Sequence, residues 1–181
     1  WTGDMAQYFE LYAAAAAGVK AVDPAYRVGG PATSKCCWVK ELIDYTQSHH
    51  VPLDFISTHL YNLDEYVLYP GRQGSPFAPG EFYESTIRQT KQAIADSARP
   101  DLPLLFTEWN SLAGRPDCEM EWALNPDMDR MYSGAFILDT CKRLDQVPDM
   151  MCWWVASDIF EETRIPNVAF NGTYGLLNIF G

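Results

Sequence analysis

Polar side chains that can do chemistry follow three short apolar segments of the sequence. His59 ends the first segment, Glu108 ends the second, and Asp158 comes shortly after the third. A carboxylate at the end of a buried strand costs free energy unless it is solvated or paired with another group. Glu108 is therefore explained equally well by an ordinary bond to a neighbour and by a catalytic role.

Aromatic rings and carboxylates gather in one stretch near the end of the chain. Trp153 and Trp154 are followed by Asp158, Glu161 and Glu162. Proteins hold sugars in this way, with a ring stacked on the sugar and the hydroxyls hydrogen bonded. The alternative places the two rings in the core and the acids on an exposed loop. One ring is expected in the core in either case, because consecutive strand residues face opposite ways.

The histidines are few and are not spaced for a metal. His59 and Tyr61 come at the end of an expected strand, where they could bond sugar hydroxyls or orient a carboxylate. A single His at such a place is more often structural. Because the chain has three His and no His-x-x-x-His spacing, we expect no metal site and no cofactor.

Helices and strands are expected to alternate along the chain. Helices are predicted at residues 5–22, 38–50, 81–97 and 127–144, with Asp4 as the first N-cap. Strands are predicted at residues 26–29, 55–59, 104–107 and 150–154, and residues 174–179 are strand-like. Continuous apolar strands separated by helices indicate an α/β fold, with a parallel sheet covered on both faces.

Two parallel architectures fit this order, a doubly wound open sheet and a (β/α)8 barrel. Residues 29–31 (GGP) lack the G-x-G-x-x-G continuation that cradles phosphate in a nucleotide fold. Polar residues instead stand at strand ends, where a barrel builds its active site. A barrel needs eight strands and about 250 residues. We therefore expect one partial domain over residues 1–181, equivalent to half of a (β/α)8 TIM barrel.

The composition narrows the range of partners. The net charge of −11 and the pI near 4.5 argue against binding to nucleic acid or to acidic membrane surfaces. These partners are negatively charged and are bound mainly through Lys and Arg. The longest apolar stretch, residues 11–19, is far shorter than the ~20 residues that span a bilayer. A neutral ligand fits better, and the aromatic content of 14% suits one with flat apolar faces.

The five cysteines follow no metal-binding pattern. Cys36 and Cys37 are adjacent and the other three are scattered, so we expect reduced thiols that pack as small apolar side chains. Reduced thiols favour a reducing compartment. No signal peptide is visible, but the chain begins at Trp1 rather than Met, so the localisation stays open.

Five segments together identify a family. They are residues 28–32 (VGGPA), 57–61 (STHLY), 108–110 (EWN), 153–162 (WWVASDIFEE) and 174–178 (YGLLN). Each is unspecific alone, but their joint order closely resembles glycoside hydrolase family 39, the β-xylosidase and α-L-iduronidase family. The resemblance extends over almost all 181 residues. It implies strands five to eight of the catalytic barrel.

The resemblance also implies a role for each motif. Glu108 corresponds to the nucleophile of a retaining, β-xylosidase-like enzyme. Asn171 stands where family members commonly carry a His, which leaves the specificity at that position open. Trp153 and Glu161 are favoured as sugar contacts, with Glu162 as the second choice. The residues expected to bind substrate are His59, Tyr61, Trp109, Asn110, Trp153, Asp158, Glu161, Glu162 and Asn171.

One expected catalytic group is missing from the sequence. The family's acid/base glutamate belongs to a W-N-E-P-N motif, which these 181 residues do not contain. Glu119 and Glu121 are alternatives within the chain, and a partner half could supply a carboxylate. A half-barrel exposes two sheet edges and an apolar inner face. We therefore expect a homo-oligomer.

Three functions are compatible with these sequence features. The first is hydrolysis of a β-xyloside or xylo-oligosaccharide. The second is a non-catalytic or weakly active sugar-binding half-barrel that self-associates. The third is a related hydrolase for an arabinoside or iduronide. An iduronide needs basic residues beside its carboxylate, and only Arg72, Arg115 and Arg164 are placed on loops to help. The iduronide therefore ranks lower.

Overall fold

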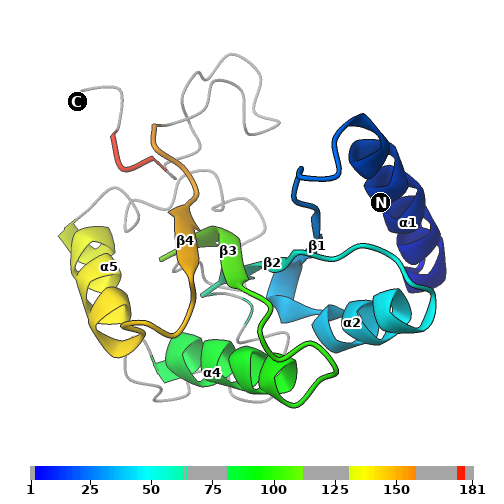
Figure 1. Ribbon diagram of the computed structural model, residues 1–181. Helices are drawn as coiled ribbons and strands as arrows, with labels where there is room; N and C mark the ends of the chain where they lie inside the picture. Colours follow the sequence, from blue (N-terminus) through cyan, green and yellow to red (C-terminus); the bar gives the residue numbers. More distant parts are fainter. Residues whose placement is uncertain (1–2, 63, 65–80, 112–130, 158–174, 178–181) are drawn as a thin grey trace. The chain divides into compact units, whose positions relative to one another are not determined.

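A computed structural model describes residues 3–62, 64, 81–111, 131–157 and 175–177 (Figure 1). The predicted alternation of helices and strands is confirmed. In chain order the elements are α1 (Met5–Val22), β1 (Gly29–Thr33), the 3-10 helix η1 (Ser34–Cys36), α2 (Val39–Ser48), β2 (Phe55–Tyr61), α4 (Glu81–Ala95), β3 (Leu104–Asn110), α5 (Met131–Arg143) and β4 (Met150–Trp153). Within these ranges no helix combines the length and apolar character needed to span a membrane.

The four strands form one sheet in the order β1-β2-β3-β4. β1 and β2 are parallel, with Gly29 opposite Phe55 and Pro31 opposite Ser57. A doubly wound sheet reverses its strand order at a switch point, whereas a barrel adds each strand beside the previous one. The predicted α/β class with a parallel sheet is confirmed, and the sequential strand order favours the barrel.

The described residues divide into two compact units. The first contains residues 3–59, 86–107 and 146–150, and the second contains the others. The strands β2, β3 and β4 and the helix α4 each have residues in both units. The prediction of one partial domain over residues 1–181 stays a prediction.

In the first unit, α1 begins at the predicted cap. Asp4 Oδ1 accepts the Gln7 N–H at 2.9 Å, and Gln7 Oε1 accepts the Asp4 N–H at 3.1 Å. This reciprocal capping box satisfies two N–H groups that a helix start leaves without partners. The helix buries Phe9, Tyr12 and Ala16, three or four residues apart. The Tyr12 hydroxyl also donates to the Pro52 carbonyl at 2.9 Å, which ties α1 to the segment before β2.

The first strand was predicted at residues 26–29, and this is wrong: it runs from Gly29 to Thr33. β-branched and aromatic residues favour strands and Gly-Gly-Pro favours a turn, but the close approach of the neighbouring strand decides the position here. A Cβ on Gly29 would lie 2.3 Å from the Phe55 ring and 2.4 Å from the Phe55 carbonyl oxygen. Only glycine fits beside β2 at this point.

Other boundaries differ by a few residues. α2 starts one residue later than predicted, because the backbone of Trp38 is left-handed, with φ 63°. β2 and β3 extend to Tyr61 and Asn110, beyond the predicted ends. A polar side chain in a strand does not interrupt backbone pairing, and Trp109 O still accepts the Trp154 N–H at 3.0 Å. Residues 127–130 of the last predicted helix lie outside the described residues.

Part of the strand-like tail pairs with the segment after β4. Of residues 174–179, the structure describes 175–177. Leu177 forms an isolated parallel bridge with Ser157. The N–H groups of Leu176 and Leu177 donate to the carbonyls of Val155 and Ala156 at 3.0 and 3.1 Å.

Asp149, the residue before β4, is hydrogen bonded to the start of β3 and to helix α4. Its Oδ2 accepts the Leu104 N–H at 2.8 Å and the Lys91 ammonium at 3.1 Å. The Leu104 hydrogen bond outweighs the effect of burial and, with Lys91, holds the pKa of Asp149 below its ordinary value. A carboxylate with a lowered folded-state pKa stabilises the fold above its unfolded pKa of about 3.9, and this stability is lost as the pH falls through the folded value.

We therefore expect Asp149→Asn to lower the midpoint of urea unfolding at about pH 7, where the carboxylate is fully charged in both states. The difference from the unsubstituted chain should shrink as the pH falls below about 3.9, because the native carboxylate is then protonated too. The exposed Asp145, changed to Asn, serves as the control. A midpoint difference that is the same at both pH values would contradict this role of Asp149.

Candidate active site

In the second unit, two side chains from neighbouring strands meet at a carboxylate. The Tyr61 hydroxyl, on β2, donates to Glu108 Oε2, on β3, at 2.7 Å. Both side chains are half-buried, and each lies at or near the carboxyl end of its strand. A hydrogen bond from a phenol to a carboxylate is charge-assisted and stronger than a neutral one. The Glu108 carboxylate is thus held in a defined direction, as a nucleophile must be.

Hydrogen bonds from side chains to the backbone hold the same strand ends. The buried carboxylate of Asp64 accepts the Tyr61 N–H at 2.8 Å. The fully buried Asn110 donates from Nδ2 to the Trp154 carbonyl and so ties β3 to the residue after β4. The Tyr83 hydroxyl lies 2.8 Å from the Leu60 carbonyl oxygen and 2.6 Å from that of Asn110.

Aromatic rings pack on the opposite face of β3 from Glu108. Trp109 is 3% exposed, and adjacent strand residues point to opposite faces. Its ring lies 5.0 Å from Trp153, 6.1 Å from Phe136 on α5 and 6.2 Å from Tyr83 on α4. Among the described residues, the buried Trp109 Nε1 has no hydrogen-bond partner. The substrate-binding roles predicted for Trp109 and Asn110 stay predictions, and their burial favours supporting roles.

The two consecutive Trp residues differ in their surroundings. Trp153 packs edge-on against Trp109, with an interplanar angle of 85°. It therefore shares the face of the sheet that carries the aromatic rings. Trp154 lies one residue beyond the end of β4, in a bend. The packing of Trp153 favours a core role for this ring, whereas the sequence motif favours it as a sugar contact.

The remaining predicted site residues are only partly described. His59 is a half-buried residue of β2 in the first unit. It stands two residues before Tyr61, so both side chains leave the strand on the same face. Four predicted sugar contacts lie outside the described residues: Asp158, Glu161, Glu162 and Asn171.

The sequence analysis did not predict two residues, Tyr83 and Asp64, whose side chains hydrogen-bond the backbone at the strand ends. Tyr83 was part of a predicted amphipathic helix and Asp64 part of a polar loop, and neither stands in a strand-end motif. The sequence signal for Tyr83 is weak, since any aromatic residue at that position would be expected in the core. What sets it apart is a buried hydroxyl, which must find a partner.

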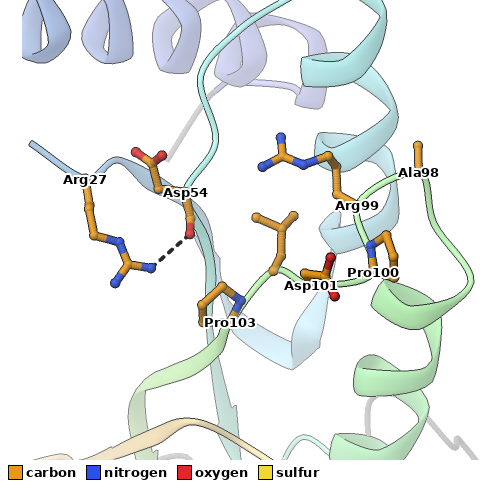
Figure 2. A pocket seen from close by; sticks show the side chains of 8 residues that line it. Arg27, Asp54, Ala98, Arg99, Pro100, Asp101 and Pro103 are labelled. Carbon is orange, nitrogen blue, oxygen red and sulfur yellow. Dashed lines mark hydrogen bonds between the residues drawn. The ribbon is translucent and has the colours of Figure 1, made fainter. Parts of the chain in front are cut away.

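A separate cleft lies in the first unit, where the strands begin. It has a volume of about 340 Å³, and Figure 2 shows the side chains around it. Arg27 Nη2 donates to the Asp54 carbonyl at 3.1 Å, and Arg99 Nη2 donates to the Leu53 carbonyl at 3.0 Å. Asp54 directly precedes β2, so this is the amino end of the strands. In a barrel enzyme, catalysis uses the carboxyl end of the strands. The cleft is therefore not the candidate active site.

The described part of the chain holds no group of three or more His, Cys, Asp or Glu side chains that could bind a metal ion. The four cysteines within it, Cys36, Cys37, Cys141 and Cys152, are not disulfide bonded.

The fold and the site together define a class of protein. A sequential parallel sheet, covered by helices, carries a carboxylate near the carboxyl end of its third strand, bonded to a phenol from the second. In (β/α)-barrel enzymes, the active site is built at the carboxyl ends of the strands. The sequence profile of the glycosyl hydrolases family 39 matches residues 1–181. The chain belongs to this family.

Individual relatives agree with the family assignment. The chain is 38% identical to a β-xylosidase from Caldicellulosiruptor saccharolyticus, over 100% of the chain and 35% of that protein. It is 30% identical to a β-xylosidase from Geobacillus stearothermophilus, over 94% of the chain and 33% of that protein. The chain thus spans about a third of the length of these relatives.

Solved structures agree as well. A crystal structure described as a monomeric β-xylosidase from Caulobacter crescentus CB15 matches with a TM-score of 0.77 and 33% identity, over 98% of the chain and 35% of that protein. The predicted fold, an α/β chain corresponding to part of a barrel, is confirmed. Because that relative is described as monomeric, the expected homo-oligomer gains no support from it and stays a prediction.

Proposed function

We propose that this chain supplies the nucleophile and part of the sugar site of a retaining glycoside hydrolase acting on β-xylosides. The observation that carries the proposal is the hydrogen bond from Tyr61 to Glu108 at the ends of neighbouring strands. Membership of family 39 and two relatives named β-xylosidases support the reaction and the substrate class. The substrate would be a xyloside or a xylo-oligosaccharide.

In the proposed mechanism, a carboxylate oxygen of Glu108 attacks the anomeric carbon of the xyloside. The bond from that carbon to the leaving oxygen breaks, and the oxygen takes the electron pair and a proton from a second carboxyl group. Water then attacks the same carbon of the glycosyl-enzyme, gives a proton to the second carboxylate and releases Glu108. Tyr61 holds Oε2 in place during the attack.

The second carboxyl group would stand about 5–5.5 Å from Glu108, as in retaining glycosidases generally. We assign it to a segment beyond these 181 residues, because the motif that the family resemblance associates with it does not occur in them. Glu119 and Glu121 remain candidates within the chain. General acid help contributes about 10²–10⁴-fold in rate. Substrates with good leaving groups need this help least and suit a test of Glu108 alone.

For the sugar ring we propose Trp154 as the stacking partner in preference to Trp153. The packing of Trp153 on Trp109 supports this choice, because it gives Trp153 a place in the aromatic cluster. His59 and Tyr61 would contact hydroxyl groups, as would the predicted acids after β4.

The proposal is tested by incubation with 2,4-dinitrophenyl 2-deoxy-2-fluoro-β-xyloside, followed by mass spectrometry and peptide mapping. Fluorine slows both chemical steps and the good leaving group restores the first, so the glycosyl-enzyme should accumulate. We expect one fluoroxylosyl group on Glu108 and one equivalent of dinitrophenolate. A folded sample that releases no dinitrophenolate and gains no mass would overturn the proposal and favour a non-catalytic, sugar-binding half-barrel.

A further inference from the structure

Tyr83 is a buried phenol that touches both strands of the Tyr61–Glu108 pair. It is the third residue of α4 and is fully buried. Its hydroxyl reaches the Leu60 carbonyl at 2.8 Å and the Asn110 carbonyl at 2.6 Å. Leu60 directly precedes Tyr61, and Asn110 follows Glu108 by two residues. A phenol has one proton, so the two carbonyls share it.

The phenol itself is rigidly held. Its ring meets Phe136 at 5.1 Å and an interplanar angle of 80°, and it meets Trp109 at 6.2 Å and 65°. These edge-to-face contacts fix the ring from two sides. The position of the hydroxyl is therefore well defined, and its hydrogen bonds hold the carboxyl ends of β2 and β3 beside each other.

We infer that Tyr83 is a positioning residue, which sets the spacing of the β2 and β3 ends so that the Tyr61 hydroxyl reaches Glu108 Oε2. Tyr83 acts through the backbone carbonyls of the two strands, to which its hydroxyl is bonded. The catalytic consequence rests on the proposed function, while the structural consequence does not. Small displacements of this kind matter because a misplacement of about 1 Å can cost about 10²-fold in rate.

The test compares Tyr83→Phe with a matched control, Tyr12→Phe. Tyr12 is also buried and also donates its hydroxyl to a backbone carbonyl, that of Pro52, but it belongs to the first unit. Both variants should lose a similar amount of thermal stability. With the fluoroxyloside, we expect Tyr83→Phe to label about 10- to 100-fold more slowly at saturation, with the half-saturating concentration unchanged. Tyr12→Phe should label like the unsubstituted chain.

A double-mutant cycle separates positioning from general destabilisation. If Tyr83 acts through Tyr61, adding Tyr83→Phe to Tyr61→Phe should slow labelling less than about twofold further, because the bond it positions is already gone. Equal labelling of Tyr83→Phe and Tyr12→Phe, or fully additive effects in the double variant, would overturn the inference.

A crystal structure of Tyr83→Phe keeps this test distinct from that of the proposed function. Failure of the unsubstituted chain to label overturns the proposed function alone. In that case, the distance from the Tyr61 hydroxyl to Glu108 Oε2 in the Tyr83→Phe crystal structure tests the positioning role. We expect it to lengthen beyond hydrogen-bond range, about 3.5 Å. A distance still near 2.7 Å would refute the positioning role.

Discussion

Replacing Glu108 with alanine is expected to abolish labelling by the fluoroxyloside and to slow glycosyl transfer from aryl xylosides by about 10⁵-fold or more. The magnitude follows from the loss of a nucleophile held at the reaction centre, since effective molarities of about 10⁵–10⁸ M are reached in well-oriented reactions. Glu108→Gln should behave alike, because it keeps the shape of the side chain but lacks the anionic oxygen. Release of dinitrophenolate measures the rate.

A small anion should restore part of the lost reaction in Glu108→Ala. Azide would enter the space of the deleted carboxylate, form a bond to the anomeric carbon and displace dinitrophenolate with its electron pair. Attack from the side of Glu108 on a β-xyloside gives α-xylosyl azide, and NMR of the product identifies its configuration. This product would assign the retaining geometry to position 108 itself.

The matched control is Glu84→Ala. Glu84 is a carboxylate of the same unit, with a side chain 31% exposed and an ion pair to Arg143 at 3.4 Å. It should label at the normal rate, because surface ion pairs typically contribute only about 0–1 kcal/mol of stability. If Glu108→Ala still becomes labelled, or if azide gives the β-azide, the nucleophile lies elsewhere.

The position of Glu108 was predictable because its signal is local. An apolar run of strand length ends in a carboxylate, and β3 does carry Glu108 near its carboxyl end. Its partner was not predictable in the same way. Tyr61 and Glu108 are 47 residues apart, and their meeting depends on the register between two strands. A shift by one residue would turn one of the two side chains to the other face.

Two details depend on contacts between residues far apart in the sequence. β1 was placed three residues too early because Gly-Gly-Pro favours a turn, while the space beside Phe55 admits only glycine. For Trp153 and Trp154, the alternation of strand residues predicted that one ring is in the core but not which one. The contact of Trp153 with Trp109, made 44 residues away along the chain, is what distinguishes them. Such long-range contacts are absent from local patterns.

The second large effect is expected on stability, from Trp109→Ala. The ring is 3% exposed and packs between Trp153, Phe136 and Tyr83. Removing a large buried aromatic side chain typically costs about 3–5 kcal/mol, through lost burial and the cavity that remains. A loss of this size is a large part of the stability of a domain, typically about 5–15 kcal/mol in total. The midpoint of urea unfolding measures it.

Two further variants distinguish a core role of Trp109 from a sugar-binding one. Leu138→Ala on α5 removes an apolar side chain that is 74% exposed, so it should change stability by less than about 0.5 kcal/mol. Trp109→Phe keeps an aromatic ring in the cluster and removes an Nε1 that is buried without a partner in the described part of the chain. It should recover much of the lost stability and leave the half-saturating fluoroxyloside concentration unchanged. A stable Trp109→Phe whose half-saturating concentration rises at least about tenfold, equivalent to about 1.4 kcal/mol of binding, would make Trp109 a sugar contact instead.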